Sequence, residues 1–187
     1  MAITYPTTLD TFTNPTSADT LASPDHALQH ANINDAVEAL EAKLAIGNTV
    51  IGTYTAYTPS FSSGVTIGDG VVSGAYCRVN DFVHVYGKFT LGSTSAVTGS
   101  VVLNLPVSVN GTMATDTMLY GTVQFRDASA SAQYPGVASF SGNTTSTALR
   151  VQIASGSFLS QTAAGTTYPF TWATSDQMTW NLYYQAA

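Results

Sequence analysis

The segment FVHVYGKFTL, residues 82–91, decides the fold class because its residues alternate in polarity with a period of two. One face would carry Val83, Val85, Gly87, Phe89 and Leu91, and the other Phe82, His84, Tyr86, Lys88 and Thr90. We predict a strand whose first face lies in a core. The second face mixes aromatic with polar residues, which suits a surface half-covered by a neighbouring subunit. An exposed aromatic face in a monomer would show the same pattern, although it would favour association.

From residue 48 onward the chain shows the same strand-and-turn pattern, and Thr, Ser, Gly, Ala and Val dominate its composition. Predicted strands cover residues 50–57, 71–79, 82–91, 100–105, 117–126, 136–141, 147–153 and 178–184. Turn sequences such as Gly68-Asp69-Gly70 and Asn110-Gly111 separate them. So many short strands predict a mainly β fold, a jelly-roll-like β-sandwich over residues 48–187.

A single long helix is predicted before this domain, in SPDHALQHANINDAVEALEAKLAIG, residues 23–47. Ser23 and Pro24 suit the first turn, and Gly47 is a stop signal. Spacings of four and three define a narrow seam that consists of His26, His30, Ile33, Val37, Leu40 and Leu44. Such a seam favours a coiled coil of identical helices. A lone amphipathic helix packed on its own β domain is the alternative.

Residues 1–22 form an arm that is rich in Thr, Asp and Pro and has no periodic pattern. Its isolated apolar residues are Ile3, Tyr5, Leu9, Phe12 and Leu21. These residues could anchor the arm as an extended strap on another protein. A disordered tail is an equally good interpretation, since such a segment cannot bury enough surface to fold alone.

Composition excludes several classes of function. Only 9% of the 187 residues are charged, the net charge is −6, and the five basic residues are scattered. We therefore expect no nucleic-acid partner. Cys77 is the only cysteine, so no disulfide framework or thiolate metal cluster is expected. No run of residues resembles a membrane span or a signal peptide, so we expect synthesis in a cytoplasm without membrane insertion.

Few residues indicate catalysis. His26 and His30 lie four apart on the seam and could bind a metal or an anion as rings in a bundle, but polar residues that fix the register explain them more simply. His84 lies on the non-core face of its strand with no Ser or carboxylate placed beside it. No nucleophile elbow, zinc motif or phosphate-binding loop is present. We expect neither enzyme activity nor a cofactor or metal.

Aromatic residues crowd the last twenty positions of the chain. Alternation would place Trp180 and Leu182 on one side of the last strand. Core packing is the simpler interpretation of most of these rings, but aromatic faces also stack on sugars. The candidate glycan contacts are Trp172, Tyr183 and Tyr184.

Residues 14–47, NPTSADTLASPDHALQHANINDAVEALEAKLAIG, resemble a segment of tailed-bacteriophage structural proteins, in which D-T-L-x-S-P-x-H-x-x-Q-H-x-x-x-N-D-A-x-E-A-L precedes a variable domain. The matching positions are Asp19, Thr20, Leu21, Ser23, Pro24, His26, Gln29, His30, Asn34, Asp35, Ala36, Glu38, Ala39 and Leu40. More diffusely, G-x-Y-C-R-x-x-x-x-V-H-V at residues 74–85, LNLP at 103–106 and the segment 169–184 resemble β domains of phage minor tail, fibre and head-decoration proteins.

This resemblance implies a virion component, made in the host cytoplasm, with a virion-docking arm (residues 1–22), a coiled stalk (23–47) and an outward β domain, usually as a homotrimer. We expect a tail or fibre-type attachment role, for which host-surface glycan is the candidate partner, with capsid decoration or a head fibre as the alternative. A third interpretation is a glycan-degrading tail spike. Its catalytic acids would have to come from Asp69, Asp81, Asp116, Asp127 and Asp176.

Overall fold

A computed structural model describes residues 18, 20, 26–44, 52–115, 119–140, 142, 144–155 and 157–187; the side chains of 41–44, 113, 115, 119 and 158 are outside this description. The chain divides into two compact units, Met1–Thr53 and Tyr54–Ala187. This division falls a few residues after the predicted boundary at 48. The five apolar residues of the arm, Ile3, Tyr5, Leu9, Phe12 and Leu21, all lie outside the described residues.

The described part of the first unit is mainly helix α1, His26–Leu44, which lies within the predicted helical segment. The apolar seam residues Ile33, Val37 and Leu40 are 53%, 47% and 45% exposed in the single chain. His26 and His30 are also exposed, and their Nε2 atoms are 3.0 Å apart. Leu44 ends the helix, and its side chain is not described. No helix in the described ranges is both long and apolar enough to cross a membrane.

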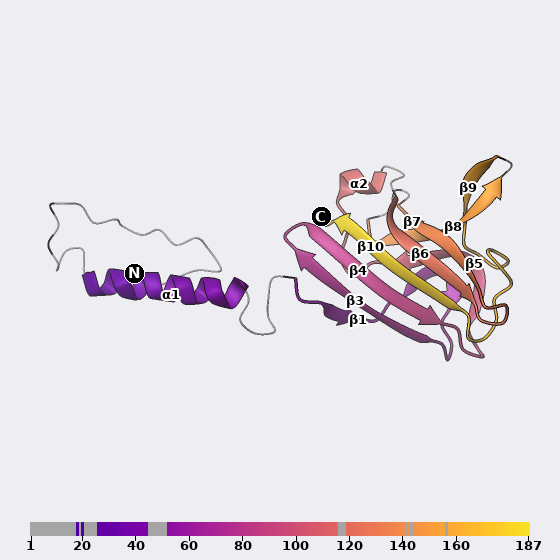
Figure 1. Ribbon diagram of the computed structural model, residues 1–187, viewed down its shortest axis with the longest axis horizontal. Coiled ribbons are helices and arrows are strands. Elements are labelled where there is room, and N and C mark those ends of the chain that lie inside the picture. The colour runs from indigo at the N-terminus through magenta and orange to yellow at the C-terminus, as the bar shows by residue number, and fades with distance from the viewer. Residues whose placement is uncertain are drawn as a thin grey trace. The chain divides into compact units, whose positions relative to one another are not determined.

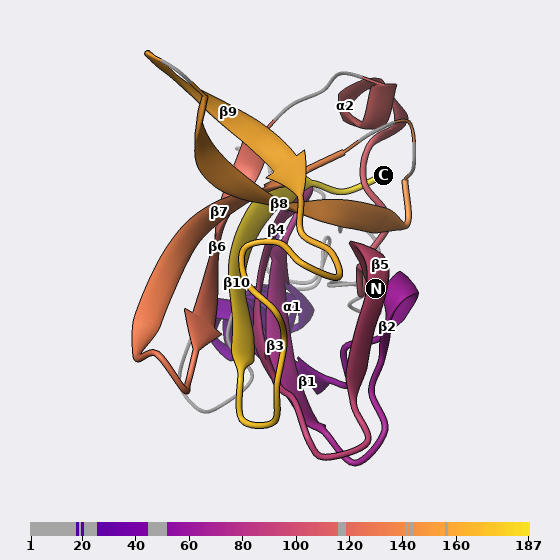
Figure 2. The ribbon, with the colours of Figure 1, turned by 90° about the vertical axis from the view of Figure 1, so that its right-hand side faces the viewer.

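The second unit is mainly β, as predicted. Its elements are β1 (Thr55–Tyr57), β2 (Phe61–Thr66), β3 (Val71–Val79), β4 (Phe82–Thr90), β5 (Ala96–Asn104), α2 (Gly111–Thr115), β6 (Leu119–Asp127), β7 (Ala132–Ser139), β8 (Ser146–Ser155), β9 (Phe158–Ala163) and β10 (Gln177–Gln185). They form one antiparallel sheet in the order β1-β3-β4-β10-β6-β7-β8-β5-β2, with β9 paired to β8. Figure 1 shows β10 between β4 and β6, and Figure 2 shows the β8–β9 hairpin projecting from the body of the unit.

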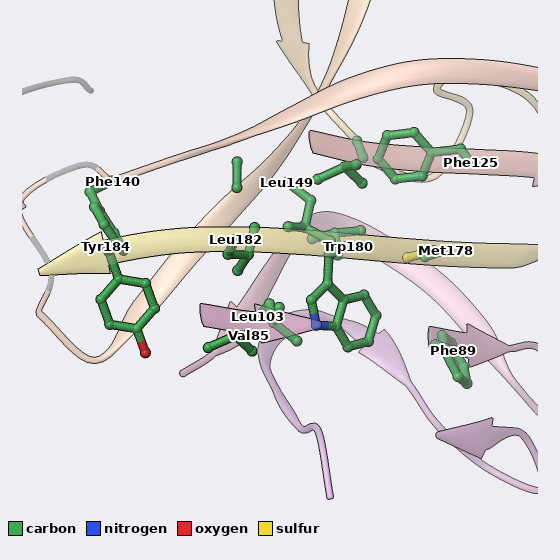
Figure 3. Packing of buried hydrophobic residues seen from close by; sticks show 14 of the residues in the cluster. Val85, Phe89, Leu103, Phe125, Phe140, Leu149, Met178, Trp180, Leu182 and Tyr184 are labelled. Atoms are coloured by element: carbon green, nitrogen blue, oxygen red, sulfur yellow. The ribbon is translucent and has the colours of Figure 1, made fainter. Parts of the chain in front are cut away.

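The sheet curls so that its two ends enclose one hydrophobic core. Phe61 of β2 packs on Phe89 of β4 and on Trp180 of β10, with ring centroids 5.6 and 6.2 Å apart, although β2 lies at the far end of the strand order. In Figure 3 the side chains of Met178, Trp180, Leu182 and Tyr184 follow one another along β10. The structure thus shows a curled antiparallel sheet, but it does not establish the predicted jelly-roll topology.

The predicted alternation of residues 82–91 is confirmed. Val83, Val85 and Phe89 are fully buried, whereas Phe82 and Tyr86 are 53% and 43% exposed on the opposite face. The same holds for β10, where Trp180 and Leu182 are buried and Asn181 and Tyr183 are exposed. Strands with one core face and one polar face are the most readable from sequence, because burial imposes the period of two.

Three elements were not predicted: β2, β9 and the short helix α2. The β2 sequence FSSGVT lacks a clean alternation because register shifts interrupt its pairing with β5, and Gly64 adopts a φ of +76° there. A Cβ at Gly64 would lie 2.2 Å from the Ser100 carbonyl oxygen, so this irregularity requires glycine. The predicted strand 50–57 is also wrong in its extent, because β1 covers only Thr55–Tyr57 among the described residues.

Candidate binding groove

The outer face of the sheet presents two rows of side chains across neighbouring strands. In the first row, Tyr86 of β4, Asn181 of β10 and Thr122 of β6 are directly opposite one another. In the second row, Thr179 of β10 is opposite Gln124 of β6. Residues in direct cross-strand register project to the same face of a sheet, so the two rows lie side by side.

These rows line an open groove of about 610 Å³. Its lining residues are His84, Tyr86, Gly87, Thr122, Val123, Gln124, Pro135, Thr179, Trp180 and Asn181. Apart from His84, which can titrate, none of these side chains carries a charge. The volume lies within the range of about 300–1,000 Å³ that is usual for small-molecule sites.

An aromatic cluster borders this groove, and we call it the outer aromatic cluster: Tyr54, Phe82, His84, Tyr86 and Tyr183. The rings of His84 and Tyr183 stack almost in parallel, with centroids 4.4 Å apart and an interplanar angle of 9°. Tyr54 meets His84 and Tyr86 edge to face at 5.5 and 5.3 Å. Tyr54 precedes β1, and the β1–β3 pairing brings it above the same face of the sheet.

His84 joins the cluster to the groove through both of its ring nitrogens. The Tyr54 hydroxyl donates to Nδ1 of His84, and Nε2 of His84 donates to Oδ1 of Asn181 over 2.6 Å. This assignment satisfies the neutral imidazole with its proton on Nε2. The Asn181 side chain is therefore held in place by a chain of two hydrogen bonds and a stacked ring, which fixes its amide nitrogen at the groove surface.

The Tyr54 hydroxyl is held in its neutral form. Desolvation raises its pKa, and the nearby Cys77, Tyr183 and Tyr86 act in the same direction. A neutral phenol can donate the hydrogen bond that orients His84, whereas a phenolate cannot. The raised pKa therefore favours the form of Tyr54 that donates to His84.

Cys77 of β3 is directly opposite His84 in the β3–β4 register, which places Cys, His and Asn on one face. An activated cysteine needs a histidine nitrogen that is free to accept its proton, but Nδ1 of His84 already accepts a hydrogen bond from the Tyr54 hydroxyl and Nε2 donates to Asn181. Cys77 is also only 8% exposed, and no hydrogen bond joins it to His84 in the described structure. The described hydrogen-bond partners of the His84 ring are Tyr54 and Asn181.

The aspartates proposed as tail-spike acids are used in turns. Both oxygens of Asp69 accept hydrogen bonds from the backbone and side chains of Ser93 and Thr94, at 2.7–3.1 Å. Asp127 accepts from the Ser129 hydroxyl and the Ala130 amide. The pKa values of both carboxyl groups are lowered by these bonds, those from Ser93 and from Ala130 being the largest single causes.

The other three aspartates of that set are Asp81, Asp116 and Asp176. Asp176 is buried, and its two oxygens accept from the amides of Ala128 and Ala173. Asp116 lies outside the described residues. Asp81 is exposed beside β4. No group of three histidine, cysteine, aspartate or glutamate side chains that could hold a metal occurs in the described ranges.

The three residues predicted as glycan contacts are placed differently from one another. Tyr184 is only 3% exposed and donates its hydroxyl to the Val107 carbonyl, so it belongs to the core. Trp172 is half-buried against Phe125 and Phe170, and its indole N–H donates to the Gly165 carbonyl. Only Tyr183, 46% exposed, is on the outer face.

Sequence reasoning found the outer face of β4 but missed Tyr54, Asn181, Thr122 and Gln124 as parts of the groove. The alternation of β4 places His84 and Tyr86 on that face, and this was the available signal. The other members come from strands that are up to about a hundred residues away in the chain, so their proximity depends on strand pairing.

Comparisons of this chain with protein-family models, with curated proteins and with solved structures found no match.

Proposed function

We propose that this chain is a non-enzymatic structural protein of a tailed-bacteriophage virion, of the tail or fibre type. In this proposal the arm docks on the particle, α1 joins two other copies in a homotrimeric coiled stalk, and the β unit is an outward, jelly-roll-like head for attachment. The observation that carries the proposal is the exposure of Ile33, Val37 and Leu40 along one side of α1.

An isolated helix of this length is marginal in water, and exposed large apolar side chains at seam spacing add to that instability. Burial between identical helices removes both problems at once, because each seam covers the same seam of another copy. These considerations favour a bundle of copies as the partner of α1.

The oligomeric state tests this proposal directly. We expect the full chain to sediment with the mass of three copies at low micromolar concentration. Val37→Asp puts a charge into the seam and should give single chains, whereas Ala31→Asp, on the opposite side of α1, should leave the trimer intact. A wild-type mass of one chain would overturn the stalk.

Location on the particle tests the attachment role. Density for this protein at the tail or its tip, seen by electron cryo-microscopy of intact particles, supports attachment. Regularly spaced density over the capsid would instead support the decoration alternative, with many copies per particle and a gain in capsid stability.

A further inference from the structure

We propose that the groove between β4, β10 and β6 is a binding site for a neutral saccharide. This inference deepens the attachment role proposed above and rests on it for its biological setting, but the groove is defined by its own geometry. Its lining includes the ring of Tyr86, 43% exposed, and four polar side chains that we call its floor: Asn181, Thr122, Thr179 and Gln124.

The floor offers hydrogen-bonding atoms that the described structure leaves unused. Asn181 uses only Oδ1, through His84, so both N–H groups of its amide are free to donate. Gln124 donates from Nε2 to Oε1 of Gln133 over 2.8 Å, which leaves its own Oε1 to accept. The hydroxyls of Thr122 and Thr179 have no hydrogen bond among the described residues. The two adjacent rows therefore offer both hydrogen-bond donors and hydrogen-bond acceptors.

The chemistry of this lining selects one class of ligand. A sugar ring combines an apolar face, which stacks on an aromatic ring, with hydroxyl groups that both donate and accept. The residues that line the groove include no Asp, Glu, Lys or Arg, so a charged ligand would find no opposite charge in the lining itself. Lys88, opposite Thr179 in the second row, lies outside that lining. A purely apolar ligand would bury polar groups without partners, which is unfavourable. A neutral saccharide satisfies all of these conditions.

The site is also organised before any ligand binds. Asn181 is fixed by His84, and His84 is fixed by the Tyr54 hydroxyl and the stacked Tyr183 ring. The floor residues lie on β10 and β6, two neighbouring strands in the middle of the strand order. Rigid placement lowers the entropy that binding costs, which matters for a ligand that gains little from each contact.

Binding of defined oligosaccharides by the full-length chain tests the site. The probes are neutral oligomers of glucose, galactose and N-acetylglucosamine, and one oligomer rich in uronic acid, each titrated by calorimetry. We expect at least one neutral probe to bind, and Tyr86→Ala to weaken it by about tenfold. Tyr86→Phe keeps the ring and should bind within a few-fold of wild type. Thr122→Val, a substitution of equal shape, should also weaken binding.

Tyr168→Ala is the matched control, because Tyr168 is 50% exposed and is not part of the groove. It should bind like wild type. Circular dichroism of every variant verifies that the β unit is folded. No binding of any neutral probe, exclusive binding of the acidic probe, or equal binding by Tyr86→Ala and Thr122→Val would each overturn the proposal.

Sedimentation of the same samples separates this inference from the proposed function. A wild-type trimer that binds no saccharide overturns the groove alone, and a monomer that binds a neutral saccharide overturns the stalk alone. If Tyr86→Ala loses the trimer and wild type binds no probe, the groove is a contact between copies, and the saccharide site is wrong.

Discussion

Gly87 makes room in the core for the indole ring of Trp180. It interrupts the apolar face of β4 opposite the indole of Trp180, and a Cβ added there would lie 2.5 Å from Cζ2 of that ring. The indole N–H of Trp180 in turn donates to the Tyr57 hydroxyl over 3.3 Å. The space that a side chain at Gly87 would occupy on β4 is thus taken by the Trp180 ring of the neighbouring strand β10. Such complementary filling of space gives protein cores their high packing density.

Gly87→Ala should destabilise the β unit by about 1–3 kcal/mol, because the rigid indole must move away from its position between Gly87 and Phe61. Urea unfolding followed by tryptophan fluorescence measures this change. Gly111→Ala is the control, since a Cβ at Gly111 meets nothing within 4 Å. Equal midpoints for Gly87→Ala and wild type would contradict this account of the packing.

The burial of Val83, Val85 and Phe89 could be predicted at this scale, because each residue's environment follows from the local period of two. The burial of Tyr184 could not. Its position is set by a hydrogen bond from its hydroxyl to Val107, about eighty residues earlier in the chain, and that contact exists only after the strands pair. The bond between Tyr54 and His84 has the same origin.

At the scale of elements, Asp69 ties two turns together. It lies in the turn between β2 and β3, and its carboxylate accepts four hydrogen bonds from Ser93 and Thr94 in the turn between β4 and β5. The Thr94 hydroxyl also accepts from the Asp69 amide over 2.9 Å. The pKa of the Asp69 carboxyl is lowered, chiefly by the Ser93 hydroxyl, because these bonds favour its charged form.

A carboxyl group whose folded pKa is lowered contributes stability above its ordinary pKa of about 3.9 and loses that contribution as the pH falls. Asp69→Asn should therefore be less stable than wild type at neutral pH. The difference should shrink below about pH 4, where wild type loses its own contribution. Urea midpoints measured across this range provide the test.

Asp81→Asn is the matched control, because the Asp81 carboxylate has no hydrogen bond among the described residues. Its midpoint at neutral pH should be close to that of wild type. A constant difference between Asp69→Asn and wild type down to acidic pH would show that the carboxylate does not stabilise the pair of turns through its charge.

Elements with one buried face were predicted, and irregular ones were not. The bounds of β3 agree with the predicted strand 71–79, whereas β9, with the sequence FLSQTA, pairs only with β8 and carries no clear period. The helix α1 could be predicted because its capping residues and spacing are local. The seam of α1 is exposed in the single chain, and its burial between copies belongs to the proposed trimer.

At the scale of the whole molecule, one buried tyrosine, Tyr184, and two partly buried ones, Tyr57 and Tyr120, set an alkaline limit to stability. Burial raises the pKa of Tyr57 to about 12, and it also raises the pKa values of Tyr120 and Tyr184. In the unfolded chain a tyrosine has a pKa of about 10. The folded state therefore holds these protons more tightly, and stability falls as the pH rises above about 10.

We expect the urea midpoint of wild type to fall between about pH 10 and about pH 12. Tyr57→Phe should reduce the steepness of this fall. It should also lower the free energy of unfolding at neutral pH by about 1 kcal/mol, because the Trp180 N–H loses its acceptor. An identical alkaline slope in both proteins would mean that the Tyr57 hydroxyl is not kept neutral by the fold.

The place of β10 between β4 and β6 also determines how this molecule can be made. A ribosome delivers β4 and β6 well before β10, so the hairpins β3–β4 and β6–β7 can form early while each keeps one unpaired edge. The centre of the sheet closes only when residues 177–185 leave the exit tunnel and insert between them. Nascent chains are therefore most open to wrong pairing with one another shortly before that moment, when a chaperone would have the most edge to protect.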